Sequence, residues 1–278
     1  MPVEAILTAA DEAVHRRRAS DFQGPLHVGV DLGTAYTMVM VLDGARRPLA
    51  AAYQFAQVVR DGVVVDFMGA IDLVKQLKAD VESRLGVELT SAASAYPPGV
   101  SLAEVQAVSY VLEGAGMICT RLIDEPTAAN ALLGVENGAV VDVGGGSTGI
   151  AVIENGQVVY TADEPTGGTH FTLVIAGAKG ISFEQAEALK LDPAAQPALF
   201  PLIRPVMEKV ATIIQRHLRG LDVPGIVLVG GAAAFPGFTD VVADVTGIPT
   251  TAPSRPMFVT PIGIAMLHED GAGDGSLT

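Results

Sequence analysis

The sequence predicts a mixed α/β protein that consists of two similar lobes. The chain has 278 residues, of which 49% are hydrophobic and 17% are charged. This composition is too apolar for a disordered chain and provides for a sizeable core. A strand that ends in an Asp-x-Gly turn and is followed by a second strand occurs twice, at Asp31 and at Asp142. Such an internal duplication indicates two units of the same design.

An amphipathic helix and a linker are predicted before the first lobe, in residues 1–25. Apolar residues follow helical spacing in residues 3–18, and residues 20–25 have the composition of a linker. The helix either docks on its own lobe or acts as a detachable docking peptide for the groove of a partner.

Lobe I is predicted in residues 26–137 together with 261–270. Two β-rich runs flank the turn at Asp31, which is typical of a hairpin. Apolar stripes at helical spacing predict helices at 70–85 and 101–115.

Lobe II is predicted in residues 138–260, and residues 271–278 are expected to be a flexible tail. A strand at 139–141 leads into the glycine turn that begins at Asp142. The β-branched, apolar run 150–153 follows this turn and predicts a second strand.

Charge and cysteine content limit the partners and the compartment. The net charge of −14 disfavours nucleic acid, because no basic field is present to attract phosphates. Cys119 is the single cysteine and lies in an apolar stretch, which predicts a core residue and a reducing compartment. The N-terminal residues lack a secretory pattern, and no stretch is apolar enough for a membrane span. We therefore expect a cytoplasmic protein without nucleic-acid or membrane partners.

Two familiar patterns coincide on the second glycine turn, and both are excluded. Gly144-x-Gly146-x-x-Gly149 fits a dinucleotide fingerprint, and Gly145-x-Ser147-x-Gly149 fits a nucleophile elbow. Both patterns require a helix directly after the turn. A strand is predicted there instead.

Both turns nevertheless have the chemistry to hold phosphate groups. Backbone N–H groups of a glycine turn can point inward as an anion-binding nest. Asp31 and Asp142 add one carboxylate to each turn, and Mg²⁺ held largely through water would separate these carboxylates from phosphates. The turns also contain hydroxyl side chains, at Thr34, Thr37, Ser147 and Thr148. The alternative is a pair of ordinary hairpins with glycine bulges.

A third glycine pair, Gly230-Gly231, follows the apolar strand predicted at 226–229. Without Cβ atoms its backbone can approach a base or an α-phosphate closely. The alternative is a simple turn at the end of a strand.

With these residues the chain resembles the actin-like ATPase superfamily, which includes actin, sugar kinases, bacterial cell-shape proteins and DnaK-type chaperones. The runs that begin at Asp31 and Asp142 resemble its two phosphate motifs. Residues 124–129, 229–231 and 260–265 are similar to its first connecting motif, its adenosine motif and its second connecting helix. The resemblance implies a duplicated ribonuclease-H-like fold with two lobes around a nucleotide cleft and no separate peptide-binding domain.

Within that superfamily the chain resembles more closely a chaperone-like family encoded in bacterial ethanolamine-utilisation operons. Residues 58–67, 94–99, 162–168 and 257–261 carry this similarity. It implies a partner that is an ethanolamine-utilisation enzyme or a microcompartment shell protein, and it allows self-association.

The superfamily resemblance also implies a role for each site residue. Asp31 and Asp142 would organise Mg²⁺, and Glu125 would orient the water that attacks the γ-phosphate of ATP. Alternatively, Glu125 is an acid that favours a helix N-terminus. The resemblance implies cofactor binding by Gly33, Thr34, Thr37, Gly144, Gly145, Gly146, Ser147, Thr148, Glu187, Lys190, Gly230 and Gly231. For Glu187 and Lys190, which share one helix face, the alternative is an exposed ion pair.

Two departures from the DnaK-type pattern bear on catalysis. Gly149 replaces a further aspartate, and no lysine matches the one that faces the phosphates. We expect an ATP-binding, chaperone-like protein that closes two lobes on Mg-ATP and is a weak ATPase at most. The alternative is a nucleotide-gated scaffold or filament-forming protein with little hydrolysis. A small-molecule kinase is disfavoured, because the connector 69–97 is too short for an acceptor pocket.

Overall fold

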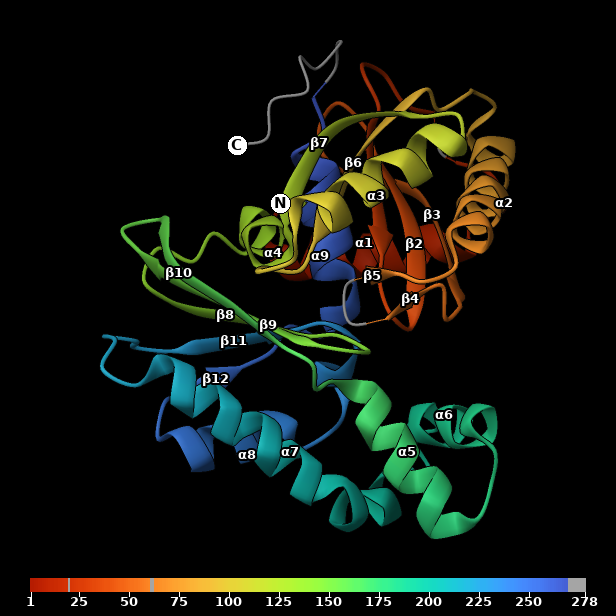
Figure 1. Ribbon diagram of the computed structural model, residues 1–278. Coiled ribbons are helices and arrows are strands. Elements are labelled where there is room, and N and C mark those ends of the chain that lie inside the picture. Colours follow the sequence, from red (N-terminus) through yellow and green to blue (C-terminus); the bar gives the residue numbers. More distant parts are fainter. Residues whose placement is uncertain (20, 61–62, 270–278) are drawn as a thin grey trace. The chain divides into compact units, whose positions relative to one another are not determined.

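The computed structural model describes residues 1–19, 21–60 and 63–269 and divides the chain into two compact units (Figure 1). The second unit is Val135–Pro256, and the first consists of the residues before and after it. The predicted tail at 271–278 lies outside the described residues. Within the described part of the chain, no helix is both long and apolar enough to cross a bilayer.

The sheet of the first unit has the strand order β3-β2-β1-β6-β7. The first three strands form an antiparallel meander, whereas β6 and β7 run parallel to β1. The strands are β1 (His27–Leu32), β2 (Tyr36–Leu42), β3 (Pro48–Phe55), β6 (Ser91–Tyr96) and β7 (Ile118–Asp124). Two short antiparallel strands are separate from this sheet, β4 (Val59–Arg60) and β5 (Val63–Val64).

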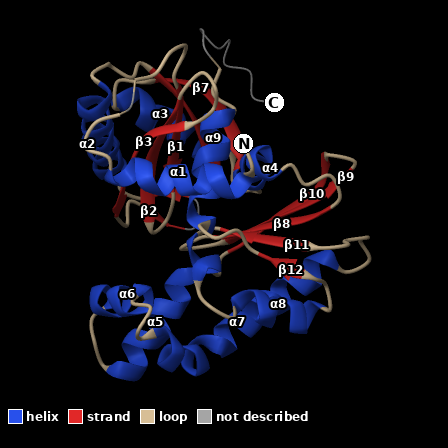
Figure 2. Cartoon of the chain, turned by 180° about the vertical axis from the view of Figure 1, so that it is seen from behind, coloured by secondary structure: helices blue, strands red, loops and turns tan. Residues whose placement is uncertain are grey.

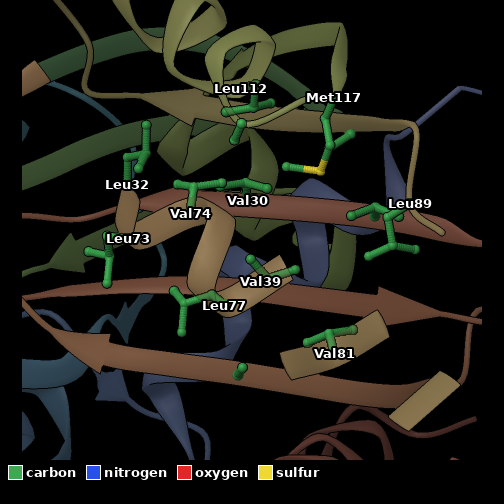
Figure 3. Close-up of a cluster of buried hydrophobic side chains, with 14 of the residues drawn as sticks. Val30, Leu32, Val39, Leu73, Val74, Leu77, Val81, Leu89, Leu112 and Met117 are labelled. Carbon is green, nitrogen blue, oxygen red and sulfur yellow. The ribbon is translucent and has the colours of Figure 1, made fainter. Parts of the chain in front are cut away.

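Two helices, α2 (Phe67–Leu85) and α3 (Leu102–Gly114), cover one face of this sheet (Figure 2). The strands alternate, so that Val30 and Val39 point into this layer and meet Val74 of α2 and Leu112 of α3 (Figure 3). Local signals set the ends of α2: Asp66 accepts a hydrogen bond from the Gly69 N–H, at 2.9 Å, and Gly86 ends the helix with a φ of 73°.

The opposite face packs against α9 (Val259–Met266), which in turn packs against α4 (Glu125–Leu133). Glycines allow this close packing. A Cβ at Gly29 of β1 would lie 2.6 Å from the Ala265 N atom, and a Cβ at Gly263 would lie 1.7 Å from the Ala128 carbonyl oxygen.

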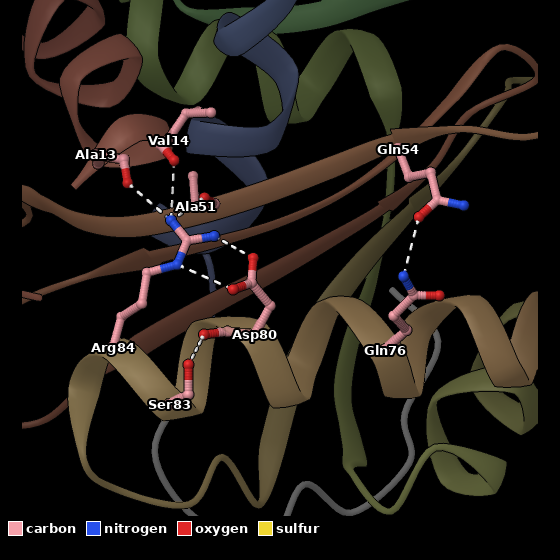
Figure 4. Close-up of polar contacts among 8 residues, drawn as sticks. All are labelled: Ala13, Val14, Ala51, Gln54, Gln76, Asp80, Ser83 and Arg84. Atoms are coloured by element: carbon pink, nitrogen blue, oxygen red, sulfur yellow. Dashed lines mark hydrogen bonds and ion pairs between the residues drawn. The ribbon is translucent and has the colours of Figure 1, made fainter. Parts of the chain in front are cut away.

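The N-terminal helix α1 (Val3–His15) is docked on its own unit, against β3. Its apolar face is buried, with Leu7 and Ala10 fully enclosed. Arg84 of α2 donates to the α1 carbonyl of Val14 at 2.9 Å and to the β3 carbonyl of Ala51 at 3.1 Å, and Asp80 holds its guanidinium (Figure 4). Arg84 thus caps α1, and the structure shows the docked arrangement.

The second unit repeats the first. Its sheet has the order β10-β9-β8-β11-β12, again with three antiparallel strands followed by two parallel ones. The strands are β8 (Gly138–Val143), β9 (Thr148–Glu154), β10 (Gln157–Glu164), β11 (Ile226–Val229) and β12 (Thr250–Thr251). The equivalent order confirms the internal duplication that the sequence predicted.

The helices of the second unit are α5 (Gly168–Lys179), α6 (Phe183–Leu191), α7 (Gln196–Leu218) and α8 (Phe238–Thr246), with 3₁₀ turns at η1 (Gly231–Ala234) and η2 (Pro256–Phe258), the latter at the boundary between the units. Ile203 and Met207 of α7 and Phe171 of α5 are fully buried with the β8 and β9 side chains. Phe171 meets Phe238 of α8 edge to face, with ring centroids 5.6 Å apart.

Candidate functional site

The two Asp-x-Gly turns have the same backbone geometry. In the first unit the Gly33 N–H donates to the Tyr36 carbonyl at 3.1 Å, and in the second the Gly144 N–H donates to the Ser147 carbonyl at 3.0 Å. Asp31 and Asp142 occupy equivalent positions, because each lies two residues before the turn glycine in the strand at the centre of its sheet.

A helix N-terminus supports the turn of the second unit. The N–H groups of Gly168 and Thr169, at the start of α5, donate to the carbonyls of Gly144 and Gly145, both at 2.8 Å. Gly167 lies against the same carbonyls, and a Cβ there would be 2.6 Å from the Gly144 oxygen. The exposed N–H groups that every helix start presents are therefore used here to fix the turn.

This support determines the direction of the next N–H groups in the turn. In a trans peptide the carbonyl and the following N–H point in opposite directions, and the described residues contain no cis peptide. Because the carbonyls of Gly144 and Gly145 point toward α5, the N–H groups of Gly145 and Gly146 point away from it. Neither N–H donates to another residue within the described part of the chain. Two such groups in succession have the arrangement from which an anion-binding nest is built.

The third glycine pair lies beside this turn. Asp142 is 7% exposed, and a Cβ at Gly230 would be 2.2 Å from its Oδ1 atom. Gly230 also has a φ of 84°, which other residues rarely adopt, and its N–H donates to the Pro256 carbonyl at 3.1 Å. The structure thus brings Asp142, Gly230 and the glycine turn together, with Gly231 at the start of η1.

The two threonines that follow the turns differ. Thr37 and Thr148 are both fully buried at the start of the second strand. The Thr148 hydroxyl donates to the Thr166 carbonyl at 2.6 Å, which assigns it a structural bond. The Thr37 hydroxyl, by contrast, has no hydrogen-bond partner among the described residues.

Glu125 is the first residue of α4, directly after β7. Asp124 caps this helix by accepting from the Thr127 N–H at 2.9 Å, and Pro126 occupies the first turn. The position of Glu125 fits both interpretations, an acid that favours a helix N-terminus and a carboxylate that orients water.

Glu187 and Lys190 form an ion pair on α6, with Lys190 Nζ 2.7 Å from Glu187 Oε2. Their side chains are only 9% and 13% exposed, so the alternative of an exposed pair is wrong. Burial lowers the pKa of Lys190, and Glu187 opposes this shift. The Thr172 hydroxyl of α5 joins the pair.

Cys119 lies partly buried against the core of the first unit. Burial raises the pKa of its thiol to about 11, so the thiol stays protonated at neutral pH.

The sequence pointed to the two turns but missed the support behind one of them. Residues 162–168 carry part of the family resemblance, but the sequence assigned no role to Gly167 and Gly168. The two adjacent glycines were the available signal, because residues without a Cβ allow another part of the chain to approach closely. Among the described residues no group of three or more His, Cys, Asp or Glu side chains has the arrangement of a metal centre.

The duplicated sheets, each with an aspartate before its glycine turn, define the fold of the actin-like ATPases. The chain is 41% identical to the ethanolamine utilization protein EutJ of Salmonella typhimurium over 242 residues, which are 87% of this chain and 85% of that protein. It belongs to the EutJ family of ethanolamine utilization proteins, as the sequence resemblance predicted.

Solved structures agree with this assignment. The crystal structure of EutJ from Carboxydothermus hydrogenoformans matches with a TM-score of 0.90 and 44% identity, over 95% of this chain and 97% of that one. MreB5 of Spiroplasma citri bound to AMPPNP has a TM-score of 0.70 at 18% identity, over 87% and 95% of the two chains. The MamK double helical filament has a TM-score of 0.66 at 18% identity, over 87% and 98%. The last two share the fold.

More distant relatives extend the comparison. Residues 103–261 match the family described as type IV pilus assembly protein PilM. The chaperone protein HscA homolog of Burkholderia ambifaria is 27% identical over 266 residues, which cover 77% of this chain and 43% of that chaperone.

Proposed function

We propose that this protein binds ATP with Mg²⁺ at its two glycine turns and serves ethanolamine utilisation as a chaperone-like protein. The observation that carries the proposal is the turn at Gly144–Ser147, in which the N–H groups of Gly145 and Gly146 point away from α5 and which directly follows the strand that contains the buried Asp142. A pair of free N–H groups favours an anion, whereas a carboxylate disfavours one. The combination fits phosphates that are accompanied by a cation.

The residues present fit Mg²⁺, because Asp31 and Asp142 supply the carboxylate oxygens that this hard cation prefers. When bound, Mg²⁺ neutralises phosphate charge. The N–H groups of Gly145 and Gly146 hold the phosphates, whereas the Thr37 hydroxyl of the first unit is fully buried and is poorly placed to touch them. We assign further nucleotide contacts to Gly33, Thr34, Gly144, Ser147, Gly230 and Gly231, but not to Thr148, whose buried hydroxyl is used in its bond to Thr166.

Hydrolysis in this proposal is slow. Glu125 orients the attacking water through its carboxylate, since positioning dominates phosphoryl transfer. Gly149, which pairs with Asp142 in the sheet, contributes no side chain. A missing carboxylate next to the phosphates weakens turnover more than binding.

The client in this proposal is an ethanolamine-utilisation enzyme or a microcompartment shell protein. The name of the EutJ relatives and the chaperone name of the HscA relative support this direction. Closure of the two units on Mg-ATP would change the surface that the client meets. The second candidate is a nucleotide-gated scaffold or filament-forming protein. It is favoured by the absence of a side-chain carboxylate at Gly149 and by the fold shared with MamK.

Calorimetric titration with ATP, with and without Mg²⁺, together with single-turnover hydrolysis tests the proposal. We expect Mg²⁺-dependent binding that is lost in Asp142→Asn and kept in Asp240→Asn, a control at an exposed aspartate of α8. Binding without turnover, with sedimentation that depends on ATP, would favour the filament-forming candidate. Absence of ATP binding by the wild type would contradict both.

A further inference from the structure

A buried polar cluster joins α5 and α6 within the second unit. Lys190 Nζ lies 2.7 Å from Glu187 Oε2, 3.0 Å from the Thr172 hydroxyl and 3.3 Å from the Gly168 carbonyl. The Thr172 hydroxyl donates in turn to Glu187 Oε2 at 2.6 Å. An ammonium group has three N–H donors, so all of those on Lys190 are used within the protein.

The cluster connects directly to the glycine turn. Gly168 accepts from Lys190 through its carbonyl and donates through its N–H to the Gly144 carbonyl. A Cβ at Gly168 would meet the Ala232 Cβ at 3.2 Å and Lys190 Nζ at 3.7 Å, so this residue is enclosed between η1 and the cluster. A continuous set of contacts therefore runs from α6, through the first residue of α5, to the turn.

These contacts leave Glu187 and Lys190 poorly placed to touch a ligand themselves. Their side chains are almost fully buried, and each bond that either group gave to a ribose would first have to be broken within the cluster. Breaking a buried pair is strongly unfavourable, because it leaves an uncompensated charge.

We propose that Thr172, Glu187 and Lys190 are positioning residues for phosphate binding. By fixing the N-terminus of α5 they hold the carbonyls of Gly144 and Gly145, and so keep the N–H groups of Gly145 and Gly146 directed toward the phosphates. The inference rests on the proposed nucleotide binding and replaces ribose contact as the role of the α6 pair.

Inorganic tripolyphosphate distinguishes the two roles, because it has the phosphates of ATP but no ribose or base. Thr172→Val removes the hydroxyl that joins the pair and is expected to weaken binding of ATP and of tripolyphosphate, with Mg²⁺, by the same factor, about 10- to 100-fold as for other supporting residues. Thr172→Ser keeps the hydroxyl and should restore both affinities. Loss of ATP affinity alone, or no loss, would overturn the inference.

A second variant avoids a lone buried charge. The double substitution Glu187→Gln with Lys190→Met should lower the affinities for ATP and for tripolyphosphate by the same factor. The control double substitution Arg204→Met with Glu208→Gln removes an exposed ion pair of α7 and should lower neither affinity. In the nucleotide-free protein, hydrogen exchange at the N–H groups of Gly168 and Thr169 should accelerate only in the first double variant. Unchanged exchange in this variant would overturn the inference. If the wild type binds neither ATP nor tripolyphosphate while exchange still accelerates in the first double variant, the proposed function is refuted instead.

Discussion

The two glycine turns start from the same backbone hydrogen bond but are supported differently. The turn of the second unit has three consecutive glycines, the N-terminus of α5 behind it and Gly230 beside its aspartate. The turn of the first unit has a single glycine, Gly33, and the strand equivalent to β11 ends at Tyr96. The comparison indicates that the backbone of the second turn is held by more contacts than that of the first. In the proposed function the second turn holds the phosphates, and the first contributes Asp31.

The largest expected effect is a difference in stability loss between alanine substitutions at Gly230 and Gly99, the glycines that follow the equivalent strands β11 and β6. Gly230→Ala places a Cβ 2.2 Å from Asp142 Oδ1 at a φ of 84° and should lower the free energy of unfolding by about 3 kcal/mol or more. Gly99→Ala has a φ of 83° but no atom within 4 Å, so about 1–2 kcal/mol is expected. Urea unfolding measures both, and equal losses would show that Gly230 is not tightly enclosed.

The next effect concerns the support of the turn by α5. Gly167→Ala has no unfavourable φ, but its Cβ would lie 2.6 Å from the Gly144 oxygen and push α5 from the turn. We expect Mg-ATP affinity to fall by about 10- to 100-fold. Gly177→Ala in the same helix meets no atom within 4 Å and should stabilise the helix by up to about 1 kcal/mol with unchanged affinity. Calorimetry decides, and an unchanged affinity in Gly167→Ala would argue that the turn does not need α5.

A smaller difference in stability is expected between valine substitutions at the equivalent threonines Thr148 and Thr37. Thr148→Val deprives the Thr166 carbonyl of its donor and should lower the free energy of unfolding by about 1–2 kcal/mol. Thr37→Val removes a buried hydroxyl without a partner among the described residues and should leave stability unchanged or raise it. Chemical denaturation of both variants tests this. Similar losses of stability in the two would refute the difference between the turns.

The smallest expected effect concerns how the stability of the second unit depends on pH. A hydrogen bond from His217, together with the charge of Arg216, holds the pKa of Glu164 below its ordinary value despite opposing burial. The stabilising contribution of such a carboxyl is present above its unfolded pKa of about 4.3 and is lost as pH falls through the lower folded pKa. Glu164→Gln should therefore flatten the loss of stability below about pH 4.3 in urea unfolding at several pH values. An unchanged profile would contradict this assignment.

Much of the fold followed from local sequence signals. The hairpins, the helices at 70–85 and 101–115 and the internal duplication are confirmed, because alternation and helical spacing report directly on which side is buried. The burial of the Glu187–Lys190 pair was not predictable, since the same spacing serves an exposed pair equally well.

The sequence by itself determined the two Asp-x-Gly turns and their glycines, because a residue without a Cβ at the end of a strand signals a backbone that turns sharply or is closely approached. Only the tertiary structure decided what approaches each turn. The contact of α5 with Gly144 and Gly145, and of Gly230 with Asp142, joins segments that are distant along the chain. Such contacts depend on how helices pack on the sheet, and no local pattern of residues encodes that packing.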